Sequence, residues 1–257
     1  MGKVRIIAIT NQKGGVGKTT TAINLSASLA TFGKKVLVID ADQQGNTTSG
    51  LGLDKNNLEL TIYNMFLGEA EIAEIKQTTC VEGLEIIPAN ISLTGAEIEL
   101  IGKEEREYIL KQELEKIKED YDFIIIDCPP SLNLITINAL TAADTVLVPI
   151  QCEYFALEGL EQLLHTINLV KKRLNPYLEI EGIVFTMFDA RTNLSLQVVE
   201  EVKRSLGASV YRSIIPRNVR LGEAPSHGLP IHLYDPKSKG AESYELLAEE
   251  VIEKEWS

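Results

Sequence analysis

Short apolar runs alternate with longer amphipathic segments along most of the chain. The runs are rich in Val, Ile and Leu and have the length of buried strands. They predict strands over residues 4–10, 35–40, 84–88, 122–127, 145–149 and 180–186. The longer segments repeat their apolar residues at helical spacing. They predict helices over residues 19–32, 104–120, 156–174, 194–206 and 241–254.

Alternating strands and helices are typical of the α/β class, in which a mostly parallel, twisted sheet carries helices on both faces. The chain has no Gly/Ser-rich linker, no low-complexity segment and no internal repeat. With 257 residues, of which 44% are apolar, it is long enough to bury one substantial core. We therefore predict a single domain over residues 1–257.

Acidic residues predominate, and their distribution is uneven. The chain has 37 Asp and Glu against 25 Lys and Arg, a net charge of −12, which excludes a surface that attracts polyanions everywhere. Residues 59–127 carry 17 acidic and 6 basic residues and nearly account for this total. Residues 203–240 carry 7 basic and 2 acidic residues. A nucleic-acid site would have to be a local patch, and the C-terminal third is locally basic.

The cysteines and the first residues indicate the compartment. Cys80, Cys128 and Cys152 are far apart and form no Cys-x-x-Cys pair, so neither a disulfide framework nor a cysteine zinc site is indicated. The first residues form no apolar signal segment, and runs such as 123–126 are too short to cross a bilayer. We expect a soluble, cytoplasmic protein.

A glycine-rich loop directly follows the first predicted strand and precedes the first predicted helix. It reads Asn-Gln-Lys-Gly-Gly-Val-Gly-Lys-Thr-Thr over residues 11–20. In such a P-loop, backbone N–H groups surround phosphate oxygens, the second lysine supplies a point charge, and the next Thr offers its hydroxyl to Mg²⁺. The standard pattern has Gly where this chain has Gln12, and an extra lysine, Lys13, begins the loop. The residues expected to contact the nucleotide are Gly14, Gly15, Val16, Gly17, Lys18, Thr19 and Thr20.

Three aspartates follow apolar strands at the edge where parallel sheets bind ligands. Asp40 and Asp42 come at the end of the strand over 35–40, and Asp127 ends the strand over 122–127. Asp127 is placed as a Walker B carboxylate that helps to hold Mg²⁺, and Asp42 is placed to orient an attacking water. An aspartate that caps a turn is common, so it is the neighbouring P-loop that favours a catalytic interpretation.

These residues resemble the deviant Walker A motif of the ParA/Soj family of chromosome- and plasmid-partitioning ATPases. The motif itself is residues 13–19, and the resemblance continues over residues 40–46, 127–131, 151–159, 189–193 and 215–220. Many relatives have Asp-Pro-Gln-Gly where this chain has Asp-Gln-Gln-Gly over residues 42–45. The resemblance implies a P-loop NTPase-like fold that binds ATP and Mg²⁺.

The resemblance also implies an ATP-dependent sandwich homodimer, in which two ATP molecules lie between facing subunits. Lys13 would reach the phosphates bound by the partner, and Asp42 would position the water. The implied sets are Lys13, Lys18 and Asp42 for catalysis, Thr19, Asp40 and Asp127 for magnesium, and Pro216 with Arg217 near the adenine.

For the whole molecule, the resemblance implies an ATPase that is weak without its partner. The ATP-bound dimer would bind double-stranded DNA without sequence preference, and a ParB-type centromere-binding protein would stimulate hydrolysis and release. Proteins of the Soj branch can also act in the control of replication initiation. Association with the nucleoid and no membrane partner are therefore expected. The residues that resemble the family's DNA contacts are Arg191 and Arg220, followed by Lys237 and Lys239.

Two alternative functions use the same scaffold. A MinD-like membrane-cycling ATPase would attach through a basic C-terminal helix, but residues 242–256 carry six glutamates and one lysine. The apolar side of that helix is expected to face the core, through Tyr244, Leu247, Ala248 and Val251. A metabolic ligase or an iron–sulfur electron donor is the other alternative. Against the latter, Cys128 and Cys152 lack the glycine-rich loops that hold such a cluster.

Overall fold

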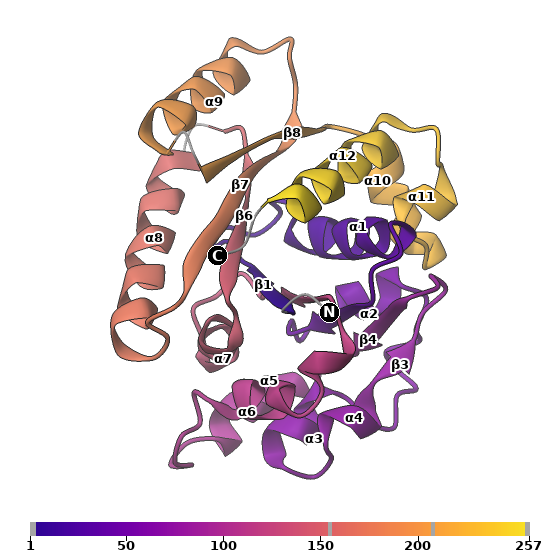
Figure 1. The fold of residues 1–257 in the computed structure, drawn as a ribbon, viewed down its shortest axis with the longest axis vertical. Coiled ribbons are helices and arrows are strands. Elements are labelled where there is room, and N and C mark those ends of the chain that lie inside the picture. The colour runs from indigo at the N-terminus through magenta and orange to yellow at the C-terminus, as the bar shows by residue number, and fades with distance from the viewer. Residues whose placement is uncertain (1–3, 154–155, 207–208, 255–257) are drawn as a thin grey trace.

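The fold is built on one eight-stranded sheet, shown in Figure 1. The structure is a computed structural model that describes residues 4–153, 156–206 and 209–254. The strand order is β3-β4-β2-β5-β1-β6-β7-β8, and all pairs are parallel except β3 with β4. The strands are β1 Arg5–Ile9, β2 Val36–Asp40, β3 Gln77–Thr78, β4 Leu84–Ile87, β5 Phe123–Asp127, β6 Thr145–Gln151, β7 Glu179–Phe188 and β8 Val210–Pro216.

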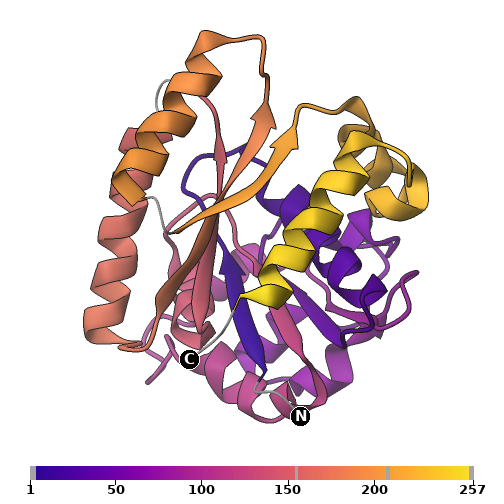
Figure 2. The same cartoon turned by 45° about the horizontal axis from the view of Figure 1, so that its top comes forward.

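Helices cover both faces of the sheet, as predicted for the α/β class. Figure 2 shows α8 and α9 on one side and α12 on the other. The helices are α1 Lys18–Thr31, α2 Asn46–Gly50, α3 Ile62–Leu67, α4 Ile72–Ile75, α5 Leu93–Glu99, α6 Ile109–Glu115, α7 Leu134–Ala142, α8 Ala156–Arg173, α9 Asn193–Leu206, α10 Val219–Glu223, α11 Ile231–Tyr234 and α12 Lys239–Glu253. Two short segments are 3-10 helices, η1 Lys118–Asp120 and η3 Ala224–His227.

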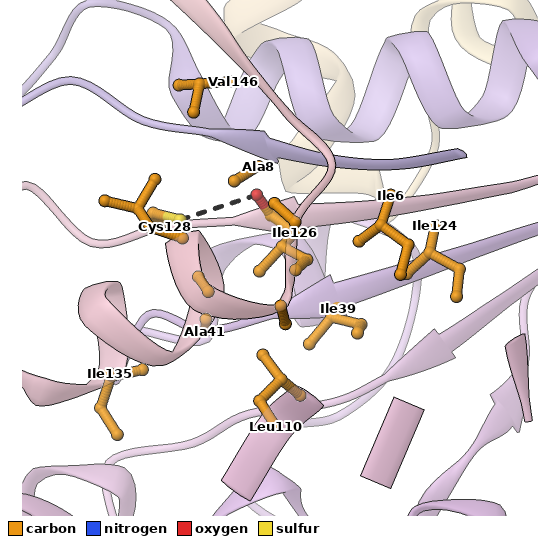
Figure 3. Packing of buried hydrophobic residues seen from close by; sticks show 14 of the residues in the cluster. Ile6, Ala8, Ile39, Ala41, Leu110, Ile124, Ile126, Cys128, Ile135 and Val146 are labelled. Carbon is orange, nitrogen blue, oxygen red and sulfur yellow. Dashed lines mark hydrogen bonds between the residues drawn. The ribbon is translucent and has the colours of Figure 1, made fainter. Parts of the chain in front are cut away.

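The central strands are buried on both faces, which explains their continuous apolar sequences. Along β1, Ile6 and Ala8 belong to the core that α3 to α9 cover, whereas Ile7 and Ile9 belong to the core beneath α1, α11 and α12. Figure 3 shows the first of these cores, where Leu110 approaches the strands from α6. The period of two along each strand thus builds two apolar layers around one sheet.

Residues 104–120 do not form the single helix that their apolar spacing predicts. Only α6 is helical in the α sense, and η1 is a separate turn. Glu105 has a φ of +52°, in the left-handed region that interrupts a right-handed helix. The strand β8 was not predicted, because it lies at the edge of the sheet and alternates buried Tyr211 and Ser213 with exposed Arg212. Edge strands lack the unbroken apolar run that marks a central strand.

Candidate functional site

The glycine-rich loop connects β1 to α1 at the carboxyl edge of the sheet. Gly15 and Gly17 have φ values of +74° and +87°, a conformation that favours glycine. Gly17 precedes the first residue of α1, so the N–H groups of the first helical turn face the loop. Inside the loop, the buried ammonium of Lys18 donates a hydrogen bond to the carbonyl of Lys13 at 3.1 Å. Burial lowers the pKa of Lys18, and the nearby Asp127 carboxylate opposes this effect. The loop is therefore a cradle of donors around one positive charge.

Asp40 and Asp127 lie side by side, because they are paired residues of the neighbouring strands β2 and β5. Asp40 is fully buried, and one of its oxygens accepts hydrogen bonds from the N–H of Thr48 at 2.8 Å and its hydroxyl at 2.7 Å. Burial raises the pKa of Asp40 to about 6. Asp42 is nearly buried two residues later, and its Oδ1 accepts the N–H of Gln44 at 2.9 Å. The two carboxylates therefore have different surroundings within one turn.

Asp127 has one oxygen that is fully bonded and one that is not. Its Oδ2 accepts the hydroxyls of Thr19 at 2.8 Å and Thr47 at 2.7 Å. Its Oδ1 is buried and has no hydrogen-bond partner among the described residues. Burial, together with the charge of Asp40, raises the pKa of Asp127 to about 7. A buried acceptor without a partner is costly, and a divalent cation beside the Thr19 hydroxyl would satisfy it. Carboxylate and hydroxyl oxygens are the donors that Mg²⁺ prefers, so these residues fit a magnesium site.

Asp40 contributes to this site indirectly. Its oxygens are occupied by Thr48 and by the N–H of Asp42, so it orders the loop and adds negative charge. In the described part of the chain, no cluster of three or more His, Cys, Asp and Glu side chains is placed to hold a metal by itself. Any metal bound here would therefore take its remaining ligands from phosphate oxygens or water, as Mg²⁺ usually does.

A cavity of about 170 Å³ opens next to the loop, between α1 and the ends of β7 and β8. Pro216 and Arg217 line it together with Gly17 and Thr20. The hydroxyl of Thr186 holds the loop against β7 by donating to the carbonyl of Val16 at 2.8 Å. The structure thus places the two residues expected near the adenine beside the residues expected at the phosphates.

Lys13 is held by its own chain. Its ammonium forms an ion pair and hydrogen bond with Glu153, which follows β6, and both side chains are partly exposed. The backbone N–H of Lys13 donates to Asn11 Oδ1 at 3.0 Å, which fixes the start of the loop. At the next residue, Gly14, a Cβ atom would meet nothing within 4 Å. The Lys13–Gly14 segment therefore faces open space and not the core.

The four predicted DNA contacts are exposed, and three of them are paired with carboxylates. The guanidinium of Arg191, in the β7–α9 loop, donates two hydrogen bonds to Asp189, at 2.8 and 2.6 Å. The other ion pairs are Arg220 with Glu223 and Asp235, and Lys239 with Glu242. For Lys237, no carboxylate lies within ion-pair distance among residues 4–153, 156–206 and 209–254. The loops after β7 and β8 leave the same end of the sheet, where Phe188 pairs with Pro216.

Some residues of the site were not predicted from the sequence. Thr47 and Thr48 follow the aspartate turn and bind the buried carboxylates, and Glu153 binds Lys13 across 140 positions. A Thr-Thr pair at the start of a helix after Asp-x-x-Gly is a usable sequence signal for the first two. The Lys13–Glu153 pair has no local signal.

The C-terminal helix has its apolar side in the core, as predicted. Tyr244, Leu247, Ala248 and Val251 are buried, and the Tyr244 hydroxyl lies 3.1 Å from that of Thr21 on α1. The tail residues 255–257, and Tyr154 and Phe155 of the block over 151–159, lie outside the described residues. Among the helices that the structure describes, none is long and apolar enough to cross a membrane.

A parallel sheet with a P-loop between its first strand and first helix, and an aspartate at the end of the adjacent strand, defines a P-loop nucleoside triphosphatase. The family model described as AAA domain matches residues 4–180. The sporulation initiation inhibitor protein Soj of Bacillus subtilis is 61% identical over 98% of both chains, and the chromosome partitioning protein ParA of Myxococcus xanthus is 55% identical over 98% of this chain and 89% of its own. The chain belongs to the ParA/Soj family of chromosome-partitioning ATPases.

A solved structure adds a nucleotide to this comparison. The cobyrinic acid a,c-diamide synthase of Mycobacterium smegmatis, solved with a bound ATP analogue and magnesium, is 40% identical with a TM-score of 0.86, over 97% of this chain and 94% of that chain. The chemistry in that protein's name is not carried over, because one fold serves many reactions.

Proposed function

We propose that this chain is an ATP-driven switch for DNA partitioning. Its ATP-bound form is a sandwich dimer that binds double-stranded DNA without sequence preference, and a ParB-type centromere-binding protein stimulates a hydrolysis reaction that is otherwise weak. The observation that carries the proposal is the hydrogen bond between the Thr19 hydroxyl and the buried Asp127 carboxylate beside Lys18, which is what a nucleoside triphosphatase requires. Control of replication initiation, as in some members of the Soj branch, is a further role to test.

In this proposal each residue of the site has one task. The loop N–H groups and the Lys18 ammonium bind the β- and γ-phosphates. Thr19 and Asp127 hold magnesium, which supplies positive charge to the phosphate oxygens when it is bound. Asp42 accepts a hydrogen bond from the attacking water and orients it toward the γ-phosphate. Asp40 keeps the Asp42 turn in place through Thr48.

The adenine is assigned to the cavity beside Pro216 and Arg217. Its walls include Gly17 and Thr20, so a nucleotide whose phosphates lie in the loop extends directly into it. The volume of about 170 Å³ leaves room for a small group such as a base. A direct check is the affinity for ATP of Pro216→Gly, which removes the rigid wall and leaves the P-loop intact.

The dimer is assigned to the face that carries Lys13 and Gly14. Gly14 is open to solvent in the single chain, so a second subunit has room to approach the loop there. Lys13 reaches the partner's phosphates after it leaves Glu153. The DNA site forms on this dimer, because Arg191, Arg220 and Lys239 are each locally neutralised by a neighbouring carboxylate and one copy gives little attraction.

The decisive experiment is sedimentation velocity with and without ATP and duplex DNA. Asp42→Ala should bind ATP, accumulate as a dimer and sediment with DNA, because it loses the water-orienting group and keeps the phosphate cradle. Lys18→Ala is the matched control and should stay monomeric with ATP. A monomeric Asp42→Ala protein at saturating ATP, or one with normal turnover, would refute the proposal.

The membrane-cycling alternative is not supported by the C-terminal helix. Its apolar side is occupied by the contacts with α1 and β8, and its outer side is acidic. An anionic bilayer would repel such a surface.

A further inference from the structure

The short helix α2 brings two neighbouring hydroxyls to the two buried carboxylates that end β2 and β5. Thr47 donates to Asp127 Oδ2 at 2.7 Å, and Thr48 donates to Asp40 Oδ2 at 2.7 Å. All four side chains are buried. Asp40 and Asp127 are paired residues of adjacent strands, so consecutive residues of one helix reach adjacent strands of the sheet. The helix therefore acts on both carboxylates at once.

The hydrogen bonds leave the two carboxylates in different states. Both oxygens of Asp40 are occupied, because Oδ2 accepts two hydrogen bonds and Oδ1 accepts the N–H of Asp42 at 3.2 Å. Among the described residues, Asp127 has donors only at Oδ2, where the hydroxyls of Thr47 and Thr19 meet. Of these two carboxylates, Asp127 is the one that offers a buried oxygen, Oδ1, to a cation.

Thr47 determines which oxygen of Asp127 stays open. A carboxylate has two equivalent oxygens, and Thr19 by itself could donate to either of them after a rotation of the Asp127 side chain. The hydroxyl of Thr47 supplies a second donor from another direction, and with both donors on Oδ2 the carboxylate keeps one orientation. Thr19 then retains its lone pairs for a cation while its proton stays on Oδ2. Thr47 thus orders both of the groups expected to hold Mg²⁺.

The position of Thr47 is itself fixed by close contacts of α2. The helix lies beside α1 in Figure 1, and a Cβ at Gly50 would overlap Ile23 of α1. At the start of α2, Gly45 has a φ of +59°, and a Cβ there would lie 2.7 Å from the carbonyl oxygen of Ala89. Contacts this close leave α2 little room to shift. The hydroxyl of Thr47 is therefore in place before a cation binds.

We propose that Thr47 is a positioning residue for the magnesium site, because its hydroxyl holds Asp127 with Oδ1 facing the cation. The inference rests on the proposed function, in which Thr19 and Asp127 hold Mg²⁺. It assigns Thr47 no contact with phosphate, water or metal. Loss of the hydroxyl should therefore weaken the binding of Mg²⁺ and leave the binding of the nucleotide itself unchanged.

Isothermal titration calorimetry of the full-length protein separates these two effects. ADP is the probe, so neither hydrolysis nor ATP-dependent dimerisation enters the measurement. ADP is first titrated in EDTA, and MgCl₂ is then titrated into the ADP complex with protein in excess. Thr47→Val should bind ADP in EDTA within about twofold of the unchanged protein. Its affinity for Mg²⁺ should fall by about tenfold or more, as is typical when a group that orients a metal ligand is removed.

Two comparisons isolate the hydroxyl of Thr47. Thr47→Ser keeps it and should retain the affinity for Mg²⁺ within about threefold, whereas Thr47→Ala lacks it and should behave like Thr47→Val. This pair keeps the inference testable if the valine variant does not fold. Thr141→Val is the matched control, because Thr141 is as buried as Thr47 but donates to the carbonyl of Ile137 at 2.8 Å. It should leave both affinities within about twofold of the unchanged protein.

Unchanged affinity for Mg²⁺ in Thr47→Val or Thr47→Ala would overturn the inference. So would an equal loss of ADP affinity in EDTA, because this result would indicate a general distortion of the loop. A serine variant as weak as the alanine variant would assign the effect to the methyl group and would also overturn it. An ADP complex of the unchanged protein that binds no Mg²⁺ would instead contradict the proposed function, and the inference would fail with it.

Discussion

Asp127 stores unfavourable electrostatic free energy in the folded chain, because its carboxylate is buried beside another one. The pKa of Asp127 is raised to about 7 and that of Asp40 to about 6, whereas an unfolded Asp titrates near 3.9. As the pH falls from 8 to 6, the folded chain takes up protons that the unfolded chain does not bind. The free energy of unfolding of the nucleotide-free protein should therefore increase by about 2 kcal/mol over this range.

Urea unfolding at pH 8, 7 and 6 measures this effect, with Asp127→Asn as the control. The variant should be more stable than the unchanged protein at pH 8 and should show a smaller pH dependence. The Asp127 assignment fails if both proteins show the same dependence on pH between 8 and 6.

At the scale of elements, the loop from β1 to α1 has one side, at Gly14, that faces open space in the single chain. Gly14→Val should leave the stability of the monomer within about 0.5 kcal/mol, because the new side chain points into open space. ATP-dependent dimerisation should fail, because the branched side chain occupies the room that a second subunit needs. Thermal unfolding and sedimentation with ATP measure the two effects separately.

Gly17→Val provides the contrast to that variant. Gly17 has a φ of +87° and precedes α1, so a branched residue there should destabilise the fold and prevent nucleotide binding. A Gly14→Val protein that dimerises as well as the unchanged one would show that this segment does not face a partner.

The central elements could be predicted from the sequence, and the peripheral ones could not. β1, β2 and β5 are buried on both faces, so each has a core of four consecutive apolar residues, preceded by Arg5 in β1 and followed by an aspartate in β2 and β5. β3 has only two residues, and β8 alternates buried residues with more exposed ones. The helices α2 to α5 are too short for a helical period to appear in their sequences. Tertiary contacts and not local pattern define these elements.

The residues of the candidate site likewise divide into those that could be predicted from the sequence and those that could not. The P-loop and the aspartates are contiguous motifs whose chemistry can be inferred from residue type and order. The hydroxyls of Thr47 and Thr48 become relevant only when α2 folds back over β2 and β5. The pairing of Lys13 with Glu153 requires β6 to lie beside β1, which is a property of the sheet and not of either segment.

At the scale of the whole molecule, an acidic chain with a net charge of −12 is proposed to bind a polyanion. The proposal requires a local site, since charges beyond about 8 Å are screened at physiological salt. Each lost phosphate contact lowers the slope of log affinity against log salt by about 0.9, so Arg191→Ala in both subunits of an Asp42→Ala dimer should reduce it by roughly 2. Duplex binding across a salt series measures the slope.

The same experiment applies to the Arg220→Ala variant. The guanidinium of Arg220 forms ion pairs with Glu223 and Asp235. Affinity should be lost equally for unrelated DNA sequences, since phosphate contacts carry no base information. An unchanged slope in a double Arg191→Ala, Arg220→Ala dimer would move the DNA site, most simply to Lys237 and Lys239.

The ion pair between Lys13 and Glu153 has a consequence for how tightly two subunits can associate. A dimer in which Lys13 contacts the partner's phosphates must first separate this lysine from its own carboxylate. Assembly is then an exchange of one anionic neighbour for another, and its net electrostatic gain is the difference between two attractions. A small difference keeps the association readily reversible, so modest changes in ATP or in local protein concentration suffice to move the population from one form to the other.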